Sequence, residues 1–220
     1  MHVGILGGTG PAGRGLGARL ASVGVEVTIG SRSAERAAEI VGELTARWPD
    51  ARLPLVAGDN ETAAASDVVV VATPWDSAAP TAGALVERLA GKVVISMANA
   101  VAKVGRELQP LVLPRGSVAE EVQAQLPGAR VAAAFHHLPA RELAEISEPM
   151  EGDVLVCSDH GEARAVVAEL VARMPHLRPL DAGSLANAAA IEAFTAVVLN
   201  LNIRYRTRAA LRLAGIDDER

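Results

Sequence analysis

Short runs of hydrophobic residues recur along the first half of the chain, and longer stretches of mixed hydrophobic and polar residues separate them. Turn-forming residues bound each run, which is typical of buried strands, and the longer stretches have the spacing of amphipathic helices. Strands that alternate with helices in this way build a parallel sheet covered on both faces. The pattern therefore predicts an α/β fold with a Rossmann-type, doubly wound parallel sheet. We expect strands at 3–6, 25–29, 53–57, 68–73 and 93–96, and helices at 11–23, 34–48, 61–66 and 79–89.

The second half of the chain has a less regular pattern. Pro110 and Pro114 interrupt residues 103–116, and we expect a loop there. The chain is expected to divide into a Rossmann domain, 1–140, and a smaller C-terminal domain, 141–220, of mixed α/β and helical structure. Further helices are expected at 118–126, 139–146 and 162–174, and further strands at 131–135, 154–157 and 177–181.

Residues 184–213 are expected to be helical and are unusually apolar. Hydrophobic residues recur there at steps of three and four, which marks one face of a helix. A face this apolar needs cover from its own domain or from a second subunit, and we favour a subunit interface. The residues that mark the face are Ile191, Phe194, Val198, Leu201 and Tyr205.

Composition narrows the class of protein. Half of the residues are hydrophobic but only 2% are aromatic, so the core must consist mainly of Ala, Val, Leu and Ile, which suits buried parallel strands. The net charge of −5 offers no basic excess for nucleic acid or anionic lipid, and the longest uninterrupted apolar run, 68–72, is too short to cross a bilayer. A first strand that begins near His2 leaves no room for a signal peptide, and a single cysteine, Cys157, fits a reducing cytosol. We therefore expect a cytoplasmic protein.

A glycine-rich loop follows the first predicted strand and leads into the first predicted helix. It contains Gly8-x-Gly10-x-x-Gly13, and the strand–loop–helix context makes this pattern informative. Glycines allow a tight turn and let the backbone approach a pyrophosphate, while the helix start offers free N–H groups and a positive dipole end. Pro11 suits the first helical turn, where its missing N–H costs little. The loop predicts a dinucleotide site.

Residues after the second strand indicate which dinucleotide binds. An NAD enzyme usually has Asp or Glu there, to accept hydrogen bonds from the ribose 2′-hydroxyl. This chain has Ser31 and Arg32, and Arg36 lies one helical turn further on. A hydroxyl and two guanidinium groups can all donate to a phosphate, although Glu35 in the same segment could pair with one of the arginines. We favour NADP, whose 2′-phosphate these groups would hold.

Short polar residues follow the fourth and fifth predicted strands, and ligands bind outside the carboxyl ends of such strands. Thr73 and Ser77 follow the fourth strand, and Asn99 follows the fifth. These side chains are suited to hold a ribose or a carboxamide. Trp75 is expected either to wall the crevice or to pack in the core.

His136 and His137 come after the sixth strand and form the most polar cluster expected in the crevice. Each could act as a general acid or base, hydrogen-bond a second ligand, or be a buried structural residue. Adjacent histidines without further ligands do not indicate a metal site, and neither does the lone pair Cys157 and His160. Because side chains alternate along a strand, only one of the two histidines should face the ligand.

Arrangements typical of proton-donating dehydrogenases are missing from the sequence. Neither Tyr-x-x-x-Lys nor Lys-x-x-x-Asn occurs, and Tyr205 is the only tyrosine. Hydride exchange between two cofactors needs proximity and alignment of two ring systems rather than a strong acid. We therefore assign no catalytic side chain and no metal.

Several motifs together resemble the F420-dependent NADP oxidoreductases. They extend over nearly the whole chain, and the last two are much more specific than the glycine loop alone. The matching runs are Gly7-Gly8-Thr9-Gly10-Pro11-Ala12-Gly13-Arg14-Gly15-Leu16, Ile29-Gly30-Ser31-Arg32, Thr73-Pro74-Trp75, His136-His137-Leu138-Pro139-Ala140 and Arg178-Pro179-Leu180-Asp181-Ala182-Gly183.

The resemblance implies reversible hydride transfer between reduced coenzyme F420 and NADP, in a homodimer whose C-terminal domain helps to close the F420 pocket. It also implies which residues contact the two cofactors. The pyrophosphate of NADP would contact Thr9, Gly10, Pro11 and Ala12, and its 2′-phosphate would contact Ser31, Arg32 and Arg36. Thr73, Ser77, Asn99 and Ala140 would line the path of NADP, and His136 and Leu138 would touch the deazaflavin ring.

Two other functions remain open on the sequence. An NADP-dependent reductase of a small carbonyl, an imine or a metal ion would keep this fold and use His136 or His137 as its proton donor. A non-enzymatic NADPH-sensing module would bind the coenzyme without turnover and contact a partner through its late apolar helix.

Overall fold

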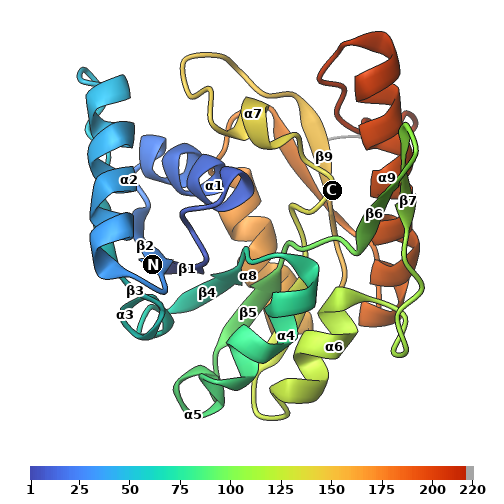
Figure 1. Ribbon diagram of the computed structural model, residues 1–220, viewed down its shortest axis with the longest axis horizontal. Helices are drawn as coiled ribbons and strands as arrows, with labels where there is room; N and C mark the ends of the chain where they lie inside the picture. Colours follow the sequence, from blue (N-terminus) through green and yellow to red (C-terminus); the bar gives the residue numbers. More distant parts are fainter. Residues whose placement is uncertain (217–220) are drawn as a thin grey trace.

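Six parallel strands form the central sheet of the protein (Figure 1). The computed structural model describes residues 1–216. The strands are β1 (His2–Leu6), β2 (Glu26–Ser31), β3 (Leu55–Asp59), β4 (Val68–Val71), β5 (Val93–Ser96) and β8 (Arg130–Ala133). Their order is β3-β2-β1-β4-β5-β8, so the winding reverses between β1 and β4, where such sheets bind their ligands. The predicted Rossmann-type fold is confirmed.

Helices cover both faces of this sheet (Figure 1). One face is covered by α1 (Pro11–Ser22), α2 (Ala34–Arg47) and α8 (Gly161–Ala172). The other is covered by α3 (Asn60–Ala64), α4 (Trp75–Gly83), α5 (Val86–Leu89) and α6 (Val118–Gln125). The single helix expected at 79–89 is wrong in detail, because α4 already begins at Trp75 and a separate α5 follows it.

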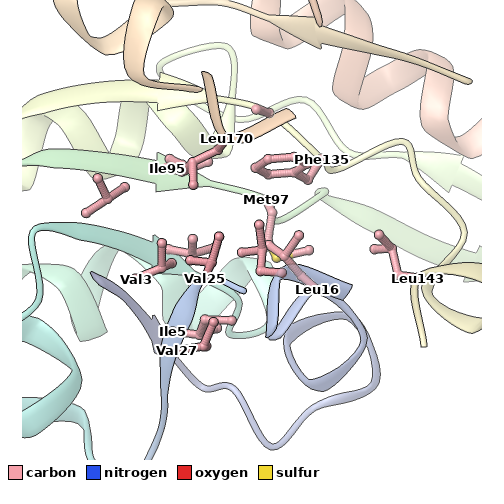
Figure 2. Close-up of a cluster of buried hydrophobic side chains, with 14 of the residues drawn as sticks. Val3, Ile5, Leu16, Val25, Val27, Ile95, Met97, Phe135, Leu143 and Leu170 are labelled. Carbon is pink, nitrogen blue, oxygen red and sulfur yellow. The ribbon is translucent and has the colours of Figure 1, made fainter. Parts of the chain in front are cut away.

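Side chains of the strands alternate between two buried apolar clusters. In β1, Val3 and Ile5 belong to the cluster beneath α1, α2 and α8, and Leu6 belongs to the cluster on the opposite face. Figure 2 shows part of the first cluster, which contains Phe135 as well as Leu170 of α8. Residues from both sides of position 140 therefore share one core, and the division into two domains stays a prediction.

A small second sheet lies beside the first. It consists of β9 (Gly152–Val156) and β10 (Leu177–Asp181), which pair in parallel, with α8 between them in the sequence. A bridge between Ala133 and Cys157 joins its end to the end of β8. The C-terminal part thus extends the Rossmann sheet at the edge where the histidine segment leaves it.

A buried arginine ties α1 to α7 (Ala140–Leu143), the short helix that follows the histidine segment. The guanidinium group of Arg19 donates to four backbone carbonyl oxygens around the end of α7. Gly15 lies at the same contact, where a Cβ would come within 2.8 Å of the carbonyl oxygen of Ala140. The acceptors of Arg19 are the carbonyl oxygens of Glu142, Leu143, Glu145 and Glu148, at 2.5–3.3 Å.

A β-hairpin occupies most of the segment that we expected to be a loop. It consists of β6 (Val101–Val104) and β7 (Glu107–Pro110), joined by a two-residue turn in which Gly105 has a φ of 61°. Pro110 lies in the last pair of the hairpin, where its missing N–H removes little from the ladder. The N–H of Leu108 donates to Oδ1 of Asn200 at 2.8 Å, and Nδ2 of Asn200 donates back to the carbonyl of Leu108 at 2.7 Å. This contact between distant segments stabilises a hairpin that two prolines argued against.

The last helix, α9 (Ala188–Tyr205), is shorter than expected. A 3-10 turn, η1 (Leu185–Asn187), precedes it, and Arg206 ends it in the left-handed conformation with a φ of 51°. Oδ1 of Asn202 then accepts from the N–H of Ala209 at 2.7 Å, which turns the chain back. The prediction of helix as far as residue 213 is therefore wrong beyond Tyr205.

A buried carboxylate anchors α9 to α6. Glu192 accepts hydrogen bonds from the N–H groups of Val118, at 2.9 Å, and Ala119, at 3.2 Å, in the first turn of α6. These N–H groups have no partner inside their own helix, so the carboxylate satisfies them. Burial raises the pKa of Glu192 to about 7.

One face of α9 remains exposed. Phe194 is 41% exposed, Val197 49% and Leu201 42%. By length and composition alone the stretch Leu185–Tyr205 is long and apolar enough to cross a membrane, a test that the core helix of a soluble protein can also pass. Glu192 and Asn200, however, place polar groups along this helix and bond them to the rest of the protein.

Candidate active site

Three glycines in the loop after β1 and in the first turn of α1 are required by the fold itself. Gly7 has a φ of 69°, a conformation that favours glycine. A Cβ on Gly8 would lie 3.0 Å from the carbonyl oxygen of Ile5, and one on Gly13 would lie 2.8 Å from the Cα of Gly8. These positions lack room for a side chain whether or not a ligand binds.

Gly10 has space that the fold does not use. A Cβ there would make only ordinary contacts, 3.5 Å from the carbonyl oxygen of Gly7 and 3.9 Å from that of Ala72. Gly10 is also the N-cap of α1, whose start no side chain within residues 1–216 caps, and whose first turn has no acidic residue. The N–H groups of that turn and the open space beside Gly10 together fit a pyrophosphate.

A cavity of about 630 Å³ extends from this loop to the end of β2. Its walls come from the glycine loop, the start of α2 and the segment between β4 and α4. It brings together most of the residues predicted to bind NADP, although their contacts with a coenzyme stay a prediction. These residues are Thr9, Gly10, Ser31, Arg32, Arg36, Thr73 and Ser77.

The two arginines of the cavity differ in their surroundings. Arg36 pairs with Glu39, whose carboxylate oxygen is 2.7 Å from Nη1, whereas Arg32 forms no ion pair with any described residue. Glu35 accepts a hydrogen bond from Oγ of Ser33 at 2.6 Å, and the structure shows no pairing of Glu35 with either arginine. Arg32 is therefore the more available cation for a phosphate group.

Sequence reasoning missed Asn60, which lines the same cavity. Its Oδ1 accepts from the N–H of Gly7 at 3.2 Å and so holds the start of the glycine loop. Asn60 directly follows β3, and ligands gather beyond the carboxyl ends of all these strands. Extending that rule to the third strand would have found it.

A second pocket, of about 180 Å³, lies on the other side of the first turn of α1. Residues 195–202 of α9 close it, and no sequence signal could identify them because their role depends on where α9 packs. Pro11 lines neither pocket and faces a neighbouring groove with Arg14 and Arg141. The predicted residues in the second pocket are Ala12, Asn99, His136, Leu138 and Ala140.

Both histidines face this second pocket, which corrects the expectation that only one would do so. The alternation of a strand does not apply because β8 ends at Ala133 and Phe135 has a φ of 65°, which places the histidines in a turn. Their ring centroids are 5.2 Å apart at an interplanar angle of 80°. Nδ2 of Asn99 donates to the backbone carbonyl of His136 at 2.6 Å and so links this turn to the end of β5.

Both histidines are uncharged at neutral pH. Burial, together with the neighbouring His137, lowers the pKa of His136 to about 3. Burial also lowers the pKa of His137. An imidazole of this kind offers one hydrogen-bond donor and one acceptor but carries no imidazolium proton.

Buried polar atoms without a hydrogen-bond partner gather at this edge of the sheet. Such atoms are rare in folded proteins, because leaving them unpaired costs free energy. Their concentration beyond β4, β5 and β8 therefore points to a ligand with its own donors and acceptors. At this edge they are Oγ1 of Thr73, Oγ of Ser96, Oδ1 of Asn99, both ring nitrogens of His136 and Nδ1 of His137, and the other two within residues 1–216 are Nε1 of Trp48, after α2, and Nε of Arg130, at the start of β8.

Trp75 does not form part of either pocket wall. It is half-buried and packs against the apolar cluster beneath α4 and α6. The core interpretation of this indole therefore holds. Within the described chain, the structure also contains no group of three or more His, Cys, Asp or Glu that could hold a metal ion.

Known proteins with similar sequences decide the family. A family model described as NADP oxidoreductase coenzyme F420-dependent matches residues 2–100. The F420-dependent NADP reductase of Methanothermobacter thermautotrophicus is 36% identical, with 100% of this chain and 97% of the relative covered. The chain belongs to the F420-dependent NADP oxidoreductase family. The resemblance that the motifs indicated is confirmed.

Other members of the family extend the similarity over the full length. The F420-dependent NADP reductase of Methanocaldococcus jannaschii is 34% identical, with 99% of this chain and 100% of the relative covered. A crystal structure from Arthrobacter sp. FB24 superimposes with a TM-score of 0.81 at 24% identity, covering 96% of this chain and 98% of that one. The similarity in fold to that structure therefore extends over nearly the whole length of both chains.

Proposed function

We propose that this protein transfers hydride reversibly between reduced coenzyme F420 and NADP (F420H2 + NADP+ = F420 + NADPH + H+). The observation that carries the proposal is a pair of pockets that meet the start of α1 two residues apart, since Gly10 lines one and Ala12 lines the other. One pocket fits a phosphorylated nucleotide, and the other fits an uncharged ring. Two reactants held in adjoining sites are what hydride transfer between cofactors requires.

The larger cavity would hold the nucleotide part of NADP. The open space at Gly10 and the free N–H groups of α1 would receive the pyrophosphate. Arg32 and Ser31 would donate to the 2′-phosphate, and Arg36 would contribute less because Glu39 already binds its guanidinium group. Thr73, whose Oγ1 is buried and unpartnered among the described residues, lies on the way to the second pocket.

The smaller pocket would hold the two reacting rings at its mouth. Bound reduced F420 supplies a hydride, and bound NADP accepts it. Leu138 and Val198, both buried, exclude water from this region, and His136 offers hydrogen bonds without charge. Because burial lowers the pKa of His136 to about 3, this residue is a neutral imidazole at neutral pH and its remaining N–H is a weak acid, which argues against a carbonyl reductase that uses it as the proton donor.

Deazaflavin absorbance tests the proposal directly. Purified protein is mixed with NADPH and oxidised F420, and the loss of the deazaflavin band is followed over time. We expect turnover with NADPH and much weaker turnover with NADH. Absence of any F420 reduction, in protein that binds NADPH, would overturn the proposal.

Two control substrates separate the alternative functions. Turnover with a small carbonyl, a cyclic imine or ferric iron, but not with F420, would indicate an NADP-dependent reductase of that substrate. Binding of NADPH without turnover on any substrate would indicate a sensing module.

The exposed face of α9 supports a homodimer. Phe194, Val197 and Leu201 form an apolar surface on a helix whose other face already packs on its own chain. In a cytoplasmic protein a second copy of the chain, rather than lipid, would cover this surface. The C-terminal domain, 141–220, would then both complete the F420 pocket and form the dimer interface. Light scattering tests this: Phe194→Glu should yield monomers, whereas Val56→Glu, at an exposed apolar residue on β3, should leave the dimer intact. A monomeric unmodified protein would refute it.

A further inference from the structure

His137 is a second histidine in the wall of the ring pocket, and nothing in the proposed reaction yet uses it. Its side chain is buried, and its ring lies edge-on to that of His136. Its Nδ1 is buried and has no hydrogen-bond partner within residues 1–216. A buried acceptor or donor left in this state costs free energy unless a ligand pairs with it.

The hydrogen bond made by the other ring nitrogen of His137 determines whether Nδ1 is a donor or an acceptor. Nε2 lies 2.8 Å from the backbone carbonyl oxygen of Asp153, and a carbonyl only accepts, so Nε2 must carry the hydrogen. The N–H of Leu155 is 3.4 Å from the same nitrogen, a weaker contact that cannot form while Nε2 is protonated. A neutral imidazole has a single N–H, and burial keeps this ring neutral. Nδ1 is therefore a bare acceptor.

Asp153 is itself held firmly, which keeps its carbonyl oxygen in place. Nε and Nη2 of Arg178 donate to its two carboxylate oxygens at 2.8 and 2.9 Å, and the N–H of Leu213 donates to Oδ2 at 2.6 Å. The Asp153 side chain is fully buried. This network gives a structural reason for Arg178 in the Arg178-Pro179-Leu180-Asp181-Ala182-Gly183 run, since it fixes the strand that orients His137.

We propose that Nδ1 of His137 accepts a hydrogen bond from the ring N–H of the deazaflavin, and so selects a ring with a donor at that edge. The inference rests on the proposed function. The pyrimidinedione ring of a deazaflavin carries one N–H between two carbonyl groups, and a bare nitrogen acceptor matches that N–H. The carboxamide of the nicotinamide offers another N–H, and because both reacting rings would lie at the pocket that His137 lines, the experiment below tests the two donors separately.

Two substitutions of His137 separate recognition of the deazaflavin by Nδ1 from the structural hydrogen bond that Nε2 makes to Asp153. His137→Gln can keep a donor to the carbonyl of Asp153 but has no atom in the place of Nδ1. His137→Asn puts a polar atom near the place of Nδ1 but cannot reach Asp153. Thermal unfolding and circular dichroism establish that each variant is folded.

The experiment compares the parent deazaflavin with its analogue methylated at the ring N–H, each with NADPH. In the unmodified protein we expect methylation to raise the KM for the deazaflavin roughly tenfold to hundredfold. His137→Gln should raise the KM for the parent by a similar factor and leave that for the methylated analogue unchanged, while the KM for NADPH stays constant in both. His137→Asn should regain part of the preference for the parent, which a purely structural role would not predict.

Four results would overturn the inference, and one of them concerns the proposed function as well. If His137→Gln discriminates between the two deazaflavins as strongly as the unmodified protein does, Nδ1 does not read the ring. If the KM rises in a His137-dependent way only when 3-acetylpyridine NADP, which lacks the amide N–H, replaces the normal coenzyme, the donor belongs to the nicotinamide. If the unmodified protein does not reduce the parent deazaflavin at all, both the inference and the proposed function fail, whereas normal turnover without discrimination removes the inference alone.

Discussion

Replacing Gly10 with alanine should separate coenzyme binding from folding. The added Cβ would lie 3.5 Å from the carbonyl oxygen of Gly7 and 3.9 Å from that of Ala72, and the φ of −71° is one that alanine adopts freely. The free energy of unfolding should therefore change by less than about 0.5 kcal/mol. The methyl group would, however, occupy the space that a pyrophosphate needs. Overpacking of this kind costs about 1–3 kcal/mol, which corresponds to a Kd for NADPH raised roughly fivefold to 150-fold.

Isothermal titration with NADPH and thermal unfolding of the same samples check this prediction. Two other glycines serve as controls. Gly13→Ala places a Cβ 2.8 Å from the Cα of Gly8, so this variant should lose stability. Gly42→Ala, in open space on α2, should gain up to about 1 kcal/mol and bind NADPH normally. The reasoning fails if Gly10→Ala binds NADPH as the unmodified protein does, or if it loses as much stability as Gly13→Ala.

Four further variants test charges described above. Arg32→Ala should raise the KM for NADPH more than tenfold, since a charge-assisted hydrogen bond contributes about 1.5–3 kcal/mol. Arg36→Ala should raise this KM less, because Glu39 already binds its guanidinium group. An equal rise in the KM for NADPH and for NADH would contradict the assignment. Arg19→Met should lower the free energy of unfolding by about 2–4 kcal/mol in urea, because four carbonyl oxygens lose their donor, and a change below about 0.5 kcal/mol would refute the role. Burial raises the pKa of Glu192 from 4.5 to about 7, so between these two pH values the folded state binds a proton that the unfolded state has released. The free energy of unfolding should therefore fall by about 3 kcal/mol as the pH rises from 4.5 to about 7. Glu192→Gln should remove most of this pH dependence. If the free energy of unfolding of the variant and of the unmodified protein change in parallel with pH, Glu192 is not the cause.

The sheet and the nucleotide loop follow from local patterns in the sequence. Each buried strand needs apolar side chains on both faces, so runs such as Val68–Val71 identify themselves. The glycine loop is equally local, because its turn and its helix start depend on neighbouring residues. Even the weaker role of Arg36 had a signal, since Glu39 lies three residues further along the same helix.

Features that depend on distant contacts could not be predicted. The β6–β7 hairpin forms beside Asn200, whose amide pairs with the backbone of Leu108. The histidine pair turns toward the pocket because Phe135 leaves the strand conformation. The wall that α9 contributes depends on how Glu192 reaches the start of α6. In each case a polar side chain or a turn far along the chain decides the outcome.

The two pockets draw on different lengths of the chain, and this sets the order in which they can form during synthesis. Every residue that lines the nucleotide cavity lies between positions 7 and 81. The ring pocket also needs Thr195 and Asn202 of α9. Because chains emerge from the ribosome N-terminus first, all the residues that line the nucleotide cavity are synthesised before those of α9 that line the ring pocket. A fragment that ends before α9 would lack one wall of the ring pocket, and under the proposed function it should not transfer hydride to the deazaflavin.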